Sequence, residues 1–132
     1  MKRSAGSQAI TAAISFTGGN SDDGKNYGRT ILVHPSDGSV FVSGDFGANG
    51  NGADYTMTLG AGGQTLTRQG IRDMFVVKLD SNLAVQSAVS FGGSGAGTTT
   101  ANCMAVDDNS VYVAGNFNSA VSFGGTVLRA EV

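Results

Sequence analysis

Residues 84–94 read AVQSAVSFGGS, and residues 9–19 read AITAAISFTGG, so one pattern occurs twice at a distance of 75 positions. In both copies, small or apolar residues fill every second position ahead of a Gly-Gly pair. Successive side chains of a strand point to opposite faces, so this period predicts a β-strand that buries one face and ends in a tight turn. The two stretches are predicted to be the same strand of two successive units.

Two longer stretches extend the repeat. GRTILVHPSDGSVFVSGDF at 28–46 corresponds to ANCMAVDDNSVYVAGNF at 101–117, which is two residues shorter at its centre. In each stretch, apolar alternation is interrupted by Ser-Asp-Gly or Asp-Asp-Asn, and these residues accept the backbone conformations of tight turns. Both stretches are therefore predicted to form β-hairpins.

The remaining segments complete the unit. TMTLGAGGQTL from Thr56 corresponds to AVSFGGTVLR from Ala120, whereas RDMFVVKLDSN at 72–82 has no second copy. No window of the chain sustains the apolar spacing of a helix without interruption by glycine or β-branched residues. We expect about four strands in each unit and essentially no helix.

A long period with several strands per unit is typical of repeat architectures, because one unit cannot bury its faces without neighbours. The sequence predicts an all-β fold of antiparallel four-stranded β-propeller blades, with a β-solenoid as the alternative. Residues 9–16 would be the last strand of a preceding blade, 28–91 a complete blade and 101–132 the start of the next. About one complete blade with parts of two others cannot close a ring, so neighbouring blades of the same polypeptide, or other copies, are the expected partners.

The succession of motifs resembles the SBBP-type β-propeller repeat family. The matching pieces are Phe16 to Gly19 and Phe91 to Gly93, Val40 to Phe46 and Val111 to Phe117, Phe123 to Leu128, and Asp73 to Asp80. The resemblance covers most of the chain. It implies antiparallel blades in long arrays, in secreted or surface-attached proteins, and it implies no common active site.

Charge and cysteine content narrow the function classes. Eight basic and ten acidic residues give a formal net charge of -2, with no basic stripe for nucleic acid. No apolar run reaches the length of a membrane span. Cys103 is the only cysteine, and its apolar neighbours predict a buried free thiol in a strand.

Catalytic chemistry has few candidate residues. His34 is the only histidine and precedes Pro35, which predicts an exposed turn residue without a nucleophile positioned beside it. Gly92 to Gly97 is not followed by the helix and the Lys-Ser/Thr pair of a phosphate-binding loop. We therefore predict no catalytic or cofactor-binding residues.

No metal site is predicted either. One Cys and one His do not make a zinc site. Paired carboxylates on loops are the kind of ligand that calcium prefers, although EF-hand spacing is lacking. The candidates, were calcium bound, are Asp22, Asp23, Asp107 and Asp108.

The functional expectation is a non-catalytic extracellular or cell-surface module, structural or binding, that belongs to a larger protein or assembly. Its ligand would be a protein or a glycan. The first copy carries a glycine-rich insertion at 46–55, which is either a ligand loop or a neutral insertion. The alternative is a propeller-domain fragment of an enzyme whose site lies mostly on other blades.

Overall fold

The computed structural model describes residues 12–18, 24–48, 55–93 and 95–130, with only the backbone of Ala48. The described residues form strands and turns and contain no helix, and hence none long and apolar enough to cross a membrane. The strands are β1 (Phe16–Gly18), β2 (Gly24–Val33), β3 (Val40–Ala48), β4 (Thr56–Leu59), β5 (Gln64–Thr67), β6 (Arg72–Leu79), β7 (Val85–Phe91), β8 (Thr99–Val106), β9 (Val111–Phe117), β10 (Val121–Phe123) and β11 (Thr126–Leu128). The predicted all-β class is confirmed.

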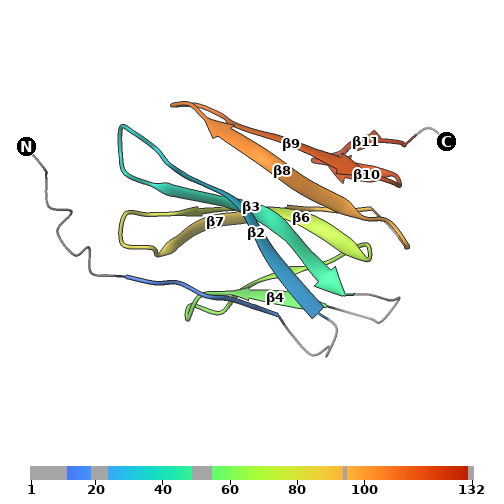
Figure 1. The fold of residues 1–132 in the computed structure, drawn as a ribbon, viewed down its shortest axis with the longest axis horizontal. Helices are drawn as coiled ribbons and strands as arrows, with labels where there is room; N and C mark the ends of the chain where they lie inside the picture. The colour runs from blue at the N-terminus through green and yellow to red at the C-terminus, as the bar shows by residue number, and fades with distance from the viewer. Residues whose placement is uncertain (1–11, 19–23, 49–54, 94, 131–132) are drawn as a thin grey trace, which may run out of the picture.

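A four-stranded antiparallel sheet in the order β2-β3-β6-β7, here called the main sheet, forms the middle layer (Figure 1). β3 pairs with β6 from Val40–Leu79 to Gly47–Arg72. In the sequence, the β4–β5 hairpin lies between β3 and β6, the two central strands of this sheet. β2 to β7 are called the first unit and β8 to β11 the second unit.

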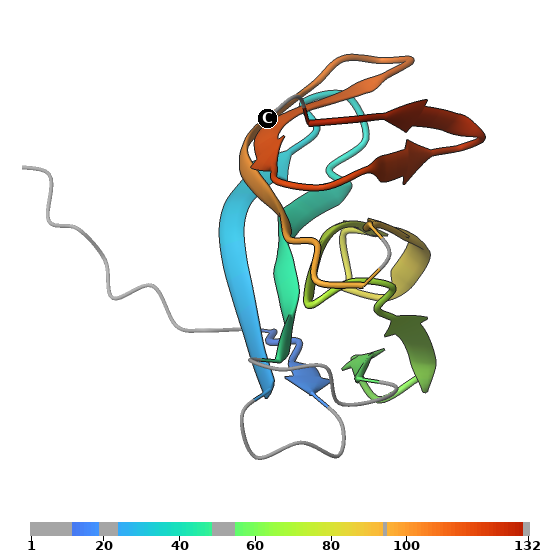
Figure 2. The ribbon, with the colours of Figure 1, turned by 90° about the vertical axis from the view of Figure 1, so that its right-hand side faces the viewer.

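Two smaller layers cover the faces of the main sheet, as Figures 1 and 2 show. On one face, β1, β4 and β5 form a three-stranded sheet. On the other face lies the β8–β9 hairpin, followed by the short β10–β11 hairpin. The described strands form no closed sheet, so the structure supports antiparallel sheets without establishing a propeller.

The first strand is shorter than expected. The sequence predicted a strand at 9–16, of which 9–11 lie outside the described residues, and β1 begins only at Phe16. β1 pairs antiparallel with β4, with Phe16 opposite Leu59, and the Gly60 amide donates to the Ser15 carbonyl at 2.8 Å.

A contact between β7 and β10 corresponds to the pairing of β1 with β4. Phe91 and Phe123 correspond in sequence to Phe16 and Leu59, and their ring centroids lie 5.0 Å apart. The Ser122 amide donates to the Gly92 carbonyl at 3.4 Å. β1 and β4 pair in one sheet, whereas β7 and β10 touch through these contacts without pairing.

The larger hydrophobic core lies between the main sheet and the β1-β4-β5 layer. Strand alternation puts Phe75, Val77 and Leu79 of β6 on this side, while Val76 faces the second unit. On that opposite side, a small cluster joins Val76 to Phe41 and Met104. The other buried members of the larger core are Val40, Phe46, Tyr55, Met57, Leu59 and Leu66.

Both units carry a β-bulge at the same point of the repeat. The pairing shifts between Gly28 and Thr30 in β2, and between Ala101 and Cys103 in β8. The extra residue turns Cys103 outward while Met104 faces the core, so the prediction of a buried thiol is wrong.

Candidate functional site

A polar pocket of about 320 Å³ lies where the β2–β3 turn of the first unit meets the β8–β9 turn of the second. His34 borders it and is only 8% exposed, so the prediction of an exposed turn histidine is wrong. The covering groups are the Phe41 ring, 6.5 Å away between centroids, and the turn that carries Asp108. The pocket is also lined by Ser39, Lys78, Ser87 and Ser110.

Both nitrogens of the His34 imidazole face carboxylates. Nδ1 lies 3.3 Å from Asp37 Oδ1, and Nε2 lies 3.5 Å from Asp108 Oδ1. Nδ1 is buried and makes no hydrogen bond. His34 therefore lies between a carboxylate of its own turn and a carboxylate of the β8–β9 turn, and so connects the two units.

Two carboxylates that line the pocket, Asp37 and Asp107, stabilise their own turns. Asp37 Oδ1 accepts hydrogen bonds from the hydroxyl and the amide of Ser39, which lower the pKa of Asp37. Asp107 accepts from the amides of Asn109 and Ser110 and from the Tyr112 hydroxyl. The pKa of Asp107 is lowered too, chiefly by the Asn109 amide. These are turn-capping interactions that Asp residues commonly make.

Two of the four calcium candidates lie within the described residues. Asp107 and Asp108 lie side by side in the β8–β9 turn, where Asp108 accepts a hydrogen bond from the Ser36 hydroxyl at 3.1 Å. Asp22 and Asp23 lie outside the described residues. Within the described ranges, no group of three or more His, Cys, Asp or Glu is placed to hold a metal ion.

A buried carboxylate beside the first bulge distinguishes the two units. Asp45 is fully buried, with the Arg29 Nε 2.7 Å and the Arg72 Nε 3.6 Å from its oxygens. The guanidinium carbons of both arginines lie over the Tyr27 ring, at 5.0 and 5.2 Å from its centroid. Asn116 takes the place of Asp45 in the second unit and accepts a hydrogen bond from the Thr100 hydroxyl. Because this position differs between the two units, we interpret the ion pairs of Asp45 as local stabilisation of the first unit.

An apolar groove runs along β9. Two adjoining pockets, of about 460 and 220 Å³, share Phe91, Val111 and Val113. β9 pairs with β8 on one edge, and no described strand pairs with its other edge. The β9 groove is defined by Val89, Phe91, Val111, Val113 and Phe123.

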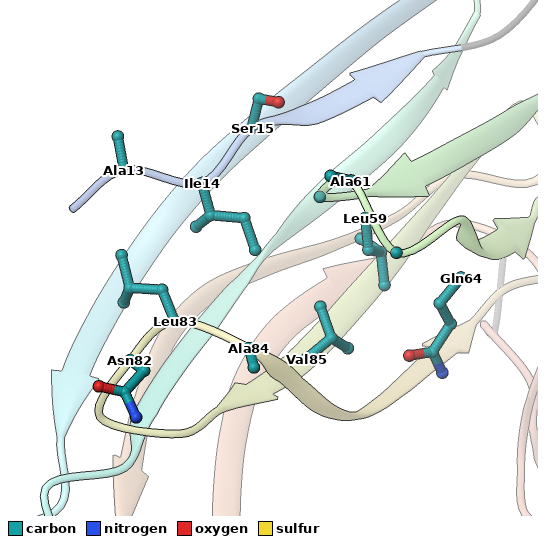
Figure 3. A pocket seen from close by; sticks show the side chains of 12 residues that line it. Ala13, Ile14, Ser15, Leu59, Ala61, Gln64, Asn82, Leu83, Ala84 and Val85 are labelled. Atoms are coloured by element: carbon teal, nitrogen blue, oxygen red, sulfur yellow. The ribbon is translucent and has the colours of Figure 1, made fainter.

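A further pocket, of about 580 Å³, lies at the other side of the molecule, between residues 13–15 and the β4–β5 and β6–β7 turns. Figure 3 shows the side chains of Ile14, Leu59, Leu83 and Val85 around the same space. Leu83 has a φ of 66°, an uncommon value for a residue with a side chain. The pocket continues the larger core outward and contains no ionisable side chain.

The described residues define an all-β protein of two sequence-equivalent antiparallel units. Comparison of the chain with protein-family models, with curated proteins and with solved structures finds no match.

Proposed function

We propose that the chain is a non-catalytic structural and binding module, built of β-propeller-type repeats, in a larger protein or assembly outside the cell or on its surface. The observation that carries this proposal is the recurrence of one contact: Phe91 of β7 meets Phe123 of β10 at the positions equivalent to Phe16 of β1 and Leu59 of β4, which are paired. Repeats that contact their neighbours in a constant way form continuous arrays. The extracellular location rests on the resemblance to SBBP-type repeats.

The faces at the two ends of the repeat support the same proposal. Ile31 and Val33 of β2 are 67% and 63% exposed. Met104 and Val106 hold the equivalent positions in β8, where they pack against Phe41 and Val76 of the first unit. The exposed side chains of β2 would therefore contact a preceding unit in the same way.

The second unit offers the complementary face. Tyr112 corresponds to Phe41, which is buried against Met104, yet Tyr112 is 58% exposed. Exposed apolar surface at matched repeat positions is typical of interaction sites. A following unit would cover Tyr112, and the turns around His34 would remain available to a protein or glycan ligand.

Sedimentation velocity of the full chain over a range of concentrations, followed by electron microscopy of the associated species, tests the proposal. We expect association that increases with concentration and ring-shaped particles, because the two end faces are different surfaces and join head to tail. Rod-shaped particles would support a solenoid. A monomer at every concentration, or sustained enzymatic turnover lost in His34→Ala, would contradict the proposed function.

A further inference from the structure

We infer that the β9 groove is an acceptor site for a β-hairpin with the side-chain pattern of residues 72–91, which would complete the second unit as β6 and β7 complete the first. The inference rests on the proposed function insofar as the hairpin belongs to the same kind of repeat. It goes further by naming the edge, the apolar surface beneath it and the chemistry of the incoming strands.

The edge of β9 is equivalent to an edge that is already occupied in the first unit. β9 reads VYVAGNF where β3 reads VFVSGDF, and both strands pair with the preceding strand across the same bulge. β3 bonds on its other side to β6 over eight residue pairs. β9 has no such partner among the described strands, so its backbone groups on that side can accept a strand.

The apolar surface of the groove matches the surface on which β6 and β7 lie in the first unit. Each groove residue has an equivalent that packs in the larger core with Phe75, Val77 and Leu79 of β6. Among the groove residues, Val89 is the most exposed, at 42%. The groove residues Val89, Phe91, Val111, Val113 and Phe123 correspond, in that order, to Ile14, Phe16, Val40, Val42 and Leu59.

Two ring contacts define the chemistry of the incoming strand. In the first unit, the Phe75 ring packs edge-on against Phe16, with centroids 5.9 Å apart. An aromatic residue at that position of the partner would meet Phe91 in the same way. On the opposite face, the Lys78 ammonium lies 5.5 Å from the centre of the Phe41 ring. A cation three positions after the aromatic residue would meet the exposed ring of Tyr112.

A fluorescent peptide with the sequence of residues 72–91, titrated with the full chain, provides the test. We expect saturable binding, with new protection of β9 amides from hydrogen exchange. Val89→Lys should weaken binding by about tenfold or more, because a charge replaces an apolar contact in the groove. Val127→Lys is the matched control, since Val127 of β11 is also an exposed valine in a strand but lies outside the groove, and should bind as the wild type does.

Three outcomes would overturn the inference: no saturable binding to the wild-type chain, equal binding to the Val89→Lys and Val127→Lys variants, or protection that appears elsewhere than in β9. A peptide with Val77→Lys should fail to bind, and its binding would also contradict the inference. If the chain associates in sedimentation but does not bind the peptide, the hairpin site fails and the proposed function stands. If the chain binds the peptide specifically but never associates, the hairpin site stands and the proposed function fails.

Discussion

At the scale of single residues, Asp73 of β6 is an acidic side chain held inside the protein. It is fully buried and accepts hydrogen bonds from the amides of Gln69, at 2.6 Å, and Gly70, at 3.0 Å. Burial raises the pKa of Asp73, although the two amides act in the opposite direction. Because folding raises this pKa, the contribution of the group to stability is greatest in acid and falls as the pH rises through the folded-state value.

Gly92 is needed next to this carboxyl group. A Cβ at Gly92 would lie 2.1 Å from the carboxyl carbon of Asp73, so Gly92→Ala must displace a buried, hydrogen-bonded group. We expect a loss of about 1–3 kcal/mol in the free energy of unfolding, measured by denaturant titration. Gly28→Ala is the control, since no heavy atom lies within 4 Å of its Cβ position. Equal stability of the two variants would refute the close packing at Gly92.

Single residues also show where the sequence was insufficient. The role of Gly92 depends on Asp73, and the burial of His34 depends on the turn at Asp108, both of which are distant in the chain. Alternation along a strand says which side chains share a face, but not which turn of another unit covers them. The polar pocket therefore could not be predicted, and Asp107 and Asp108, which line it, were named from the sequence only as calcium candidates.

At the scale of elements, the hairpins were predictable and the bulges were not. The stretches at 28–46 and 101–117 form the β2–β3 and β8–β9 hairpins, because apolar alternation and turn residues both act locally. A bulge adds one residue to a strand without any obligatory residue type. Its effect on the exposure of Cys103 becomes visible only when the pairing register is known.

His34 and Asp108 join the β2–β3 and β8–β9 turns, and the two side chains should be energetically coupled. We expect a double-mutant cycle of His34→Gln and Asp108→Asn to give a coupling of about 0.2–1 kcal/mol, because Nε2 of His34 lies 3.5 Å from Asp108 Oδ1. Denaturant unfolding of the four proteins measures this coupling.

A cycle of His34→Gln with Asp80→Asn is the matched control for this coupling. Asp80 also caps a turn, accepting the amides of Asn82 and Ala84, but it belongs to the β6–β7 turn. The control cycle should give no coupling. A His34–Asp108 coupling no larger than that of the control cycle would show that the contact between the two turns does not contribute to stability.

At the scale of the whole molecule, the two units are unequally stabilised. β3 and β6 lie between two layers, and the side chains of β6 are buried on both faces. The β8–β9 hairpin contacts the main sheet through the small cluster of Phe41, Val76 and Met104, and the β9 groove leaves its far side open. Buried apolar area is the main favourable contribution to folding, so the second unit should be the less stable part.

Hydrogen exchange of the backbone amides should reveal this inequality under native conditions. We expect amides of β8 and β9 to exchange at least about tenfold faster than those of β3 and β6, because the hairpin can open while the larger core stays intact. Leu79→Ala would be expected to accelerate exchange in both units, since the main sheet supports the hairpin. Met104→Ala should accelerate exchange in β8 and β9 alone. Uniform protection in the wild-type chain would mean that the small cluster couples the two units into one cooperative structure, and the open groove would then have no effect on local stability.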